Sequence, residues 1–102
     1  TALRCGINPV IVVNNNHSLN QEQGGVEGIY GGRTSGSDEL WLFPDANFAQ
    51  IAEAMGCFGI VVNKPSELSS ALDKAFSSGK PAVVDVKTHL EGIAPQPYLP
   101  NN

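Results

Sequence analysis

The chain has 102 residues, of which 41% are apolar and 16% are charged, and its net charge is −4. This length suits a single domain, because two separate hydrophobic cores need a longer chain. We therefore expect residues 1–102 to form one domain. The charges are mixed along the chain without long runs, which argues against nucleic acid and anionic membrane surfaces as partners.

Cysteine use and hydropathy indicate the compartment. The two cysteines, Cys5 and Cys57, lie far apart among apolar residues and glycines. This pattern fits neither a disulfide framework nor a zinc cluster, and it favours a reduced compartment. No apolar stretch approaches the roughly 20 residues that a membrane span needs, and the first residues lack the plan of a signal peptide. The sequence therefore predicts a soluble, cytoplasmic protein.

A helical turn and a strand are the first expected elements. Residues 1–5 have the pattern of the last turn of a helix, which Gly6 closes. An apolar run at residues 10–13 follows a proline and stops at three asparagines, which is typical of an interior strand of a parallel sheet. We place this strand near residues 9–14.

Residues 19–45 show no clear period. Gln, Glu, Ser and paired glycines dominate this stretch. A connection of this length inside a compact domain is either functional or disordered. For Trp41 and Phe43 within it we favour a plug that fills the core under the loop, and a recognition surface is the alternative.

Helices and strands alternate in the rest of the chain. Asn47 can cap a helix whose apolar residues share one face, and a proline opens the next helix. Such alternation implies a parallel sheet covered on both faces, so we predict an α/β fold with a partial doubly wound parallel sheet and flanking helices. The expected elements are a helix near residues 47–55, a strand near 58–62, a helix near 65–78, a strand near 81–87 and an extended Pro-rich tail over 89–102.

The three asparagines stand at the carboxyl end of the first strand, where open parallel sheets bind their ligands. An amide oxygen is a hard, neutral ligand that suits a magnesium ion which also holds phosphate oxygens. The same composition occurs in ordinary strand-ending turns, and the spacing alone favours the turn by roughly two to one.

The order and spacing of four segments favour the metal-binding interpretation over the ordinary turn. These segments are residues 11–16, 48–56, 65–72 and 79–86. Together they resemble the carboxy-terminal, diphosphate-binding domain of thiamine diphosphate enzymes, in the group of acetolactate synthase, pyruvate oxidase and benzoylformate decarboxylase. The resemblance implies thiamine diphosphate and Mg²⁺ as cofactors. It also implies, for the parent enzyme, decarboxylation or carboligation of a 2-oxo acid substrate. Because an open edge of the strand at residues 10–13 and uncovered apolar faces favour pairing with another copy, we expect a homo-oligomer.

The resemblance assigns site residues to the turn after the first strand. Asn15 would be the side-chain metal ligand, and the backbone carbonyl of His17 would be the next metal ligand. Asn16 is an alternative to Asn15, and His17 stands where the family usually has glycine or a small polar residue. Free N–H groups near the diphosphate would come from the two residues that follow. The expected cofactor-binding residues are Asn14, Asn15, His17, Ser18 and Leu19.

The sequence also departs from the family pattern. The family's signature opens with Gly-Asp-Gly upstream of the asparagine pair, and this chain has no such tripeptide. The glutamate that activates the cofactor comes from another domain of the family. We therefore expect a fragment that carries no catalytic residue of its own. A non-catalytic α/β module for assembly or partner binding is the alternative.

We expect no catalytic function for the two histidines or for Asp85. His17 and His89 could act as general bases, but no nucleophile is placed near either, so we interpret both as loop histidines. Asp85 lies within the last expected strand. We expect it near solvent at the strand end rather than buried.

The 102-residue chain should show no decarboxylase or carboligase activity when thiamine diphosphate and Mg²⁺ are added, because it lacks the metal-binding aspartate and the activating glutamate. Assays of the purified chain with pyruvate test this expectation. Turnover that a chelator abolishes would contradict it.

Overall fold

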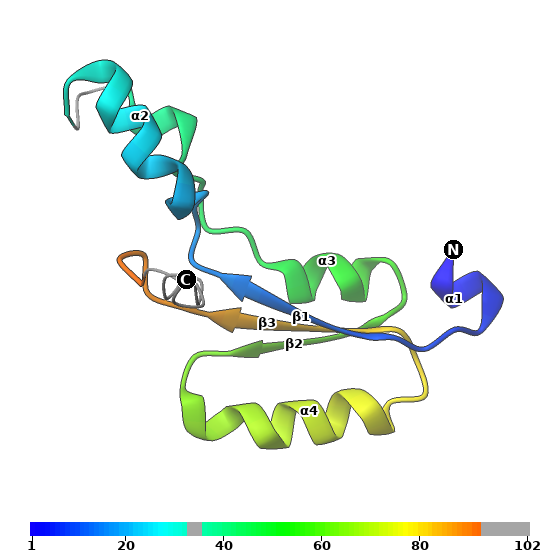
Figure 1. The fold of residues 1–102 in the computed structure, drawn as a ribbon. Helices are drawn as coiled ribbons and strands as arrows, with labels where there is room; N and C mark the ends of the chain where they lie inside the picture. Colours follow the sequence, from blue (N-terminus) through cyan, green and yellow to red (C-terminus); the bar gives the residue numbers. More distant parts are fainter. Residues whose placement is uncertain (33–35, 93–102) are drawn as a thin grey trace, which may run out of the picture.

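The chain is built around a three-stranded parallel sheet, which a computed structural model shows with its flanking helices (Figure 1). The structure describes residues 1–32 and 36–92. The strands are β1 (Val10–Asn15), β2 (Phe58–Val62) and β3 (Ala82–Lys87). They lie in the order β1-β3-β2, and Ala82 pairs with both Val10 and Phe58. The predicted α/β class is confirmed, and each strand lies within one residue of its predicted position.

Two helices cover the two faces of the sheet. Figure 1 shows α3 (Phe48–Ala54) on one face and α4 (Leu68–Ser77) on the other. α3 begins where predicted, because the side chain of Asn47 accepts a hydrogen bond from the backbone N–H of Gln50 at 2.8 Å. A short 3-10 helix, η3 (Pro65–Glu67), leads into α4. Among the helices of the described chain, none combines the length and the apolar content that a membrane crossing requires.

A short helix also precedes the sheet. α1 (Ala2–Cys5) ends at Gly6, whose φ of 65° lies in the left-handed region. Glycine adopts this conformation at little cost, so the predicted helix stop is confirmed.

The main core lies between α4 and the sheet. Ala71 and Ala75 of α4 pack with Val62, Ala82 and Val84, and each of these residues is at most 2% exposed. The small alanine side chains let the helix lie close to the strands. Because side chains alternate along a strand, Val84 faces α4 and the next residue of β3 faces α3. The α3 face of the sheet therefore receives the polar residues of β3.

α3 approaches the sheet most closely at Gly59 of β2. A Cβ atom on Gly59 would overlap the backbone carbonyl of Ala49, so only glycine fits there without a shift of the helix. Ala49 and Ala52 are the buried residues of α3. Backbone contact, rather than large interlocking side chains, therefore sets the distance between α3 and the sheet.

β1 is an edge strand in the described chain, so the prediction of an interior strand is wrong there. It pairs with β3 on one side, and Ile11 and Val12 are each 52% exposed. An apolar run indicates that a strand can be buried on both faces, but burial also needs covering elements. α3 and α4 pack chiefly over β2 and β3 instead.

The connection after β1 contains a helix that the sequence pattern does not predict. η1 (Asn20–Glu22), a 3-10 helix, leads into α2 (Gln23–Tyr30), which projects away from the sheet (Figure 1). Three of the eight residues of α2 are glycines, which oppose helix formation, and none is buried. Because α2 buries no residue, is rich in glycine and has no capping side chain, it has no strong helix signal in the sequence.

Trp41 and Phe43 differ in their environment. They follow a second 3-10 helix in this connection, η2 (Asp38–Leu40). Trp41 is 1% exposed, which confirms the predicted core plug. Phe43 is 48% exposed, so the prediction is wrong for this residue. The backbone N–H of Phe43 donates to the carbonyl of His17 at 2.8 Å.

The chain turns after β3 instead of running extended. The N–H of Gly92 donates to the carbonyl of His89 at 3.1 Å, so the predicted tail is wrong for residues 89–92. Residues 93–102 lie outside the described part of the chain, where the extended tail stays a prediction.

Gly59→Ala should lower the free energy of unfolding by about 2–3 kcal/mol, because the added methyl group overpacks the contact with Ala49. Urea denaturation measures the loss. Gly24→Ala in α2 is the matched control, because a Cβ there meets no atom within 4 Å. We expect the control to leave the midpoint unchanged or slightly higher. Equal midpoints for the Gly59 variant and the unmodified chain would contradict the close approach.

Candidate functional site

Polar residues gather at the carboxyl ends of β1 and β3, on the sheet face that α3 covers. Asn15 is the last residue of β1 and is 5% exposed. Asp85 of β3 is fully buried, at 0% exposed, so the prediction of a carboxylate near solvent is wrong. Parallel register brings Asn15 opposite Lys87. Two strands that are distant in sequence thus contribute side chains to one cluster.

Asn15 is held by hydrogen bonds from both ends of its side-chain amide. Its Nδ2 donates to Asp85 Oδ1 at 2.9 Å and to the backbone carbonyl of Ala46 at 3.1 Å. Its Oδ1 accepts from the backbone N–H of His17 at 3.2 Å. Asp85 Oδ2 accepts from the N–H of Phe48 at 3.0 Å, which ties the start of α3 to the same carboxylate.

Lys87 supplies positive charge beside these carboxylates. Its Nζ lies 3.0 Å from Asp45 Oδ1 and 3.3 Å from Asp85 Oδ2, and it donates to the carbonyl of Ala46 at 3.1 Å. Partial burial lowers the pKa of Lys87, but the hydrogen bonds to the two aspartates outweigh this effect, and the pKa lies above its ordinary 10.5. The hydrogen bond from Lys87 lowers the pKa of Asp45 below 3.8. Both groups are therefore charged near neutral pH.

The turn after β1 has an unusual backbone at His17. Its φ is 58°, and it is the only described residue other than glycine with a positive φ. This left-handed conformation favours glycine, which agrees with the glycine that related proteins are expected to carry there. The carbonyl of His17 accepts from Phe43 N–H, and its Nδ1 lies 3.4 Å from Asp45 Oδ1.

The other two asparagines serve the local backbone and a neighbouring strand end. Asn14 is exposed, and its Oδ1 accepts from Thr88 Oγ1 at 2.6 Å. Asn16 Oδ1 accepts from the N–H of Ser18 at 3.1 Å, as in an ordinary Asx turn. Asn15 is the buried member of the three, and it alone contacts Asp85.

Ser18 and Leu19 do not offer the free N–H groups that the sequence suggests. The N–H of Ser18 donates to Asn16, and the N–H of Leu19 donates to the carbonyl of Trp41 at 2.7 Å. The hydroxyl of Ser18 differs, because its Oγ is buried and has no hydrogen-bond partner among the described residues. A diphosphate contact from Ser18 would therefore use its side chain.

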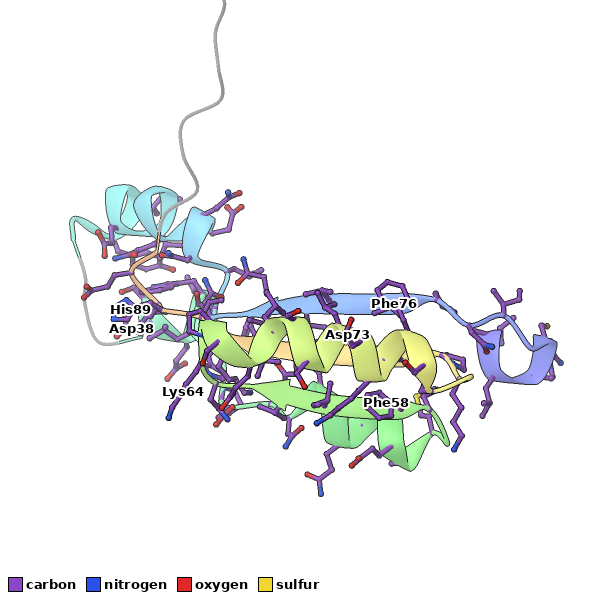
Figure 2. All side chains as sticks on the ribbon, turned by 90° about the horizontal axis from the view of Figure 1, so that it is seen from below. Asp38, Phe58, Lys64, Asp73, Phe76 and His89 are labelled. Carbon is purple, nitrogen blue, oxygen red and sulfur yellow. The ribbon has the colours of Figure 1, made fainter. Side chains whose placement is uncertain are left out.

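The histidines lie at the same end of the molecule but belong to different groups. His17 faces Asp45, whereas His89 lines an apolar groove of about 390 Å³ with Val62 and Leu68. Figure 2 shows His89 and Lys64 near the carboxyl end of the sheet. No described cluster of three or more His, Cys, Asp or Glu residues could hold a metal ion. Asn15 Oδ1 and the His17 carbonyl are neutral oxygens of the kind that a hard cation takes as ligands.

Comparisons with known proteins place the chain in a family. The family described as "Thiamine pyrophosphate enzyme, C-terminal TPP binding domain" matches residues 1–86. The chain is 35% identical over 88 residues to a probable acetolactate synthase of Mycobacterium bovis, with 86% of the chain covered. It is 38% identical over 87 residues to the acetolactate synthase large subunit of Haemophilus influenzae, with 84% covered.

Another relative is named for a different activity. The chain is 34% identical over 97 residues to a 2-hydroxyacyl-CoA lyase of Arabidopsis thaliana, with 84% of the chain covered. In each of these three comparisons the match spans 15% of the relative's own length.

Lys87→Met should lower the free energy of unfolding by about 3 kcal/mol, because it leaves the buried Asp85 carboxylate without its cation. The stability that Lys87 adds is present below pH 10.5 and is lost as pH rises through its elevated pKa. The stability from Asp45 is present above pH 3.8 and is lost as pH falls through its lowered pKa. The free energy of unfolding of the unmodified chain should therefore exceed that of Lys87→Met by a constant amount between about pH 5 and pH 9, and by less at both extremes. Urea unfolding across pH measures this difference.

Lys74→Met on the exposed side of α4 is the control for this series, because it removes the same charge away from the site. We expect it to change the midpoint little at any pH. A loss for Lys87→Met no larger than that of the control would mean that the ion pair does not stabilise the buried carboxylate.

Proposed function

The chain belongs to the family of C-terminal TPP-binding domains of thiamine pyrophosphate enzymes, and we propose a function on this basis. We propose that it contributes the half-site that holds the diphosphate of thiamine diphosphate through a magnesium ion. Thiamine diphosphate is the ligand that defines this family. The observation that carries the proposal is the buried Asn15 amide at the carboxyl end of β1. Open parallel sheets bind ligands at this end of their strands.

The donors at the turn suit magnesium. Mg²⁺ prefers oxygen ligands and takes only a few of them from protein, leaving the rest to water and phosphate. Asn15 Oδ1 meets a single described protein donor, the N–H of His17. The His17 carbonyl accepts one hydrogen bond and keeps a second lone pair. We assign Asn15 and His17 as the metal ligands, and Asn14, Ser18 and Leu19 as neighbours of the cofactor.

We infer that the complete protein acts on a 2-oxo acid, by decarboxylation or by carboligation. The relatives that are named acetolactate synthase and 2-hydroxyacyl-CoA lyase support a lyase or transferase, although the second name gives a substrate that is not a 2-oxo acid. Bound thiamine diphosphate supplies stabilisation of a carbanion. The described residues would bind and orient the diphosphate end of the cofactor, and we assign no catalytic residue to this chain. A non-catalytic α/β module remains the alternative outcome.

We also propose that the protein is cytoplasmic and forms a homo-oligomer. Cys5 and Cys57 are both free thiols, which supports a reduced, cytoplasmic location. Among the described strands β1 lies at an edge of the sheet, with Ile11 and Val12 half-exposed, which supports a homo-oligomer because an open strand edge and apolar side chains favour association.

Asn15→Ala should weaken the Mg²⁺-dependent binding of thiamine diphosphate by roughly tenfold or more. At other metal sites, loss of a residue that only hydrogen-bonds to a metal ligand already lowers the metal affinity by that factor. His17→Ala should change the affinity little, because the backbone carbonyl remains. Titration calorimetry on the complete protein that carries this chain, at fixed Mg²⁺, measures both.

Asn16→Ala is the matched control, because the described side-chain hydrogen bond of Asn16 lies within the turn. A larger loss for Asn16→Ala than for Asn15→Ala would move the metal ligand to Asn16. Equal losses for Asn15→Ala and His17→Ala would assign a function to the His17 side chain. Binding that is absent from the unmodified protein, or independent of Mg²⁺, would favour the non-catalytic module.

A further inference from the structure

The amide of Asn15 is oriented by two hydrogen-bond acceptors on one side. Nδ2 has two hydrogens, and the two acceptors within reach are Asp85 Oδ1 and the carbonyl of Ala46. Both hydrogens are therefore used. Oδ1 then points to the opposite side, toward the turn at His17.

Rotation of the amide by half a turn would reverse this arrangement. Oδ1 of Asn15 would then meet the carboxylate of Asp85 and the carbonyl of Ala46, neither of which has a hydrogen to donate. Asn15 is 5% exposed and Asp85 is 0% exposed, so water is largely kept from this contact. An unsatisfied polar contact in such a place is strongly unfavourable. The buried carboxylate thus selects one of the two amide orientations.

Asp85 is itself fixed on its other side. Its Oδ2 accepts from Phe48 N–H at 3.0 Å and lies 3.3 Å from Lys87 Nζ. Lys87 also donates to the carbonyl of Ala46, the second acceptor of the Asn15 amide. The carboxylate and the carbonyl that orient Asn15 are therefore held by one cation and by the start of α3.

We propose that Asp85 is a positioning residue that fixes the Asn15 amide so that its oxygen, rather than its nitrogen, faces the magnesium ion. This inference rests on the proposed function and deepens it. The described contacts of the two carboxylate oxygens are all to protein donors, so Asp85 acts through Asn15. Its chemistry is suited to this task, because an ionised carboxylate accepts hydrogen bonds and donates none.

A double-mutant cycle tests the proposal in the complete protein that carries this chain. The four forms are the unmodified protein, Asp85→Asn, Asn15→Ala and the double variant, and the measurement is Mg²⁺ affinity by calorimetry with saturating thiamine diphosphate. Asp85→Asn keeps the volume of the side chain but introduces a donor, so the two orientations of Asn15 become similar. We expect Asp85→Asn to weaken Mg²⁺ binding about 10- to 100-fold.

The double variant gives the decisive comparison. Once Asn15 is alanine there is no amide to orient, so Asp85→Asn should add almost nothing to the loss caused by Asn15→Ala. A purely structural contribution of Asp85 would lower the affinity by the same factor in both backgrounds, and that additive result would overturn the proposal. Asp73→Asn is the charge-matched control, because Asp73 lies exposed on α4 (Figure 2). It should leave the Mg²⁺ affinity unchanged.

The cycle also separates this proposal from the proposed function. If Asn15→Ala weakens Mg²⁺ binding and Asp85→Asn does not, the positioning proposal alone is wrong. If Asn15→Ala has no effect, the metal assignment is wrong and the positioning proposal fails with it.

A measurement without substitutions covers the case in which Asp85→Asn does not fold. In the unmodified, metal-free protein with ¹⁵N-labelled asparagine, the side-chain hydrogens of Asn15 should exchange with solvent far more slowly than those of the exposed Asn63. Equal exchange rates would show that Asp85 does not hold the amide, and would overturn the proposal.

Discussion

The contact between the buried carboxylate of Asp85 and the amide of Asn15 is the interaction on which the rest of the site depends. A carboxylate with no exposed surface is stable only where donors surround it. Here the donors come from the end of β1, the start of α3 and Lys87 at the end of β3. Satisfying one buried charge therefore draws three segments together, and the geometry of the site and the stability of the fold have a common cause.

The sequence predicts the sheet and its covering helices well, because each has a strong local signal. β2 is a short apolar run, Asn47 has the side chain that a helix start needs, and Gly6 stands where α1 must end. The α4 region has a proline at its start and apolar residues at helical spacing. These signals depend on neighbours within a few residues, so they can be read without knowledge of the fold.

The remaining features depend on contacts that the local sequence does not contain. A single aspartate in an apolar strand suggests an exposed strand end, and only the positions of Lys87 and α3 make its burial favourable. Residues of the turn after β1 could be proposed as metal ligands by resemblance, but the partners of Asn15 lie 31 and 70 positions away along the chain. α2 contains three glycines and buries no residue, so helix propensity does not indicate it.

The pairing of β1 with β3 has a consequence for how the protein is made. Asn15 meets its carboxylate partner only after a further 70 residues have been synthesised, and among the described strands β1 has no neighbour until β3 follows. Contacts of such long sequence separation form slowly, because loop closure precedes the energetic gain. Until β3 has been synthesised, β1 therefore lacks the strand with which it pairs in the described sheet. The turn that follows it acquires its final shape only when almost the whole described chain has left the exit tunnel.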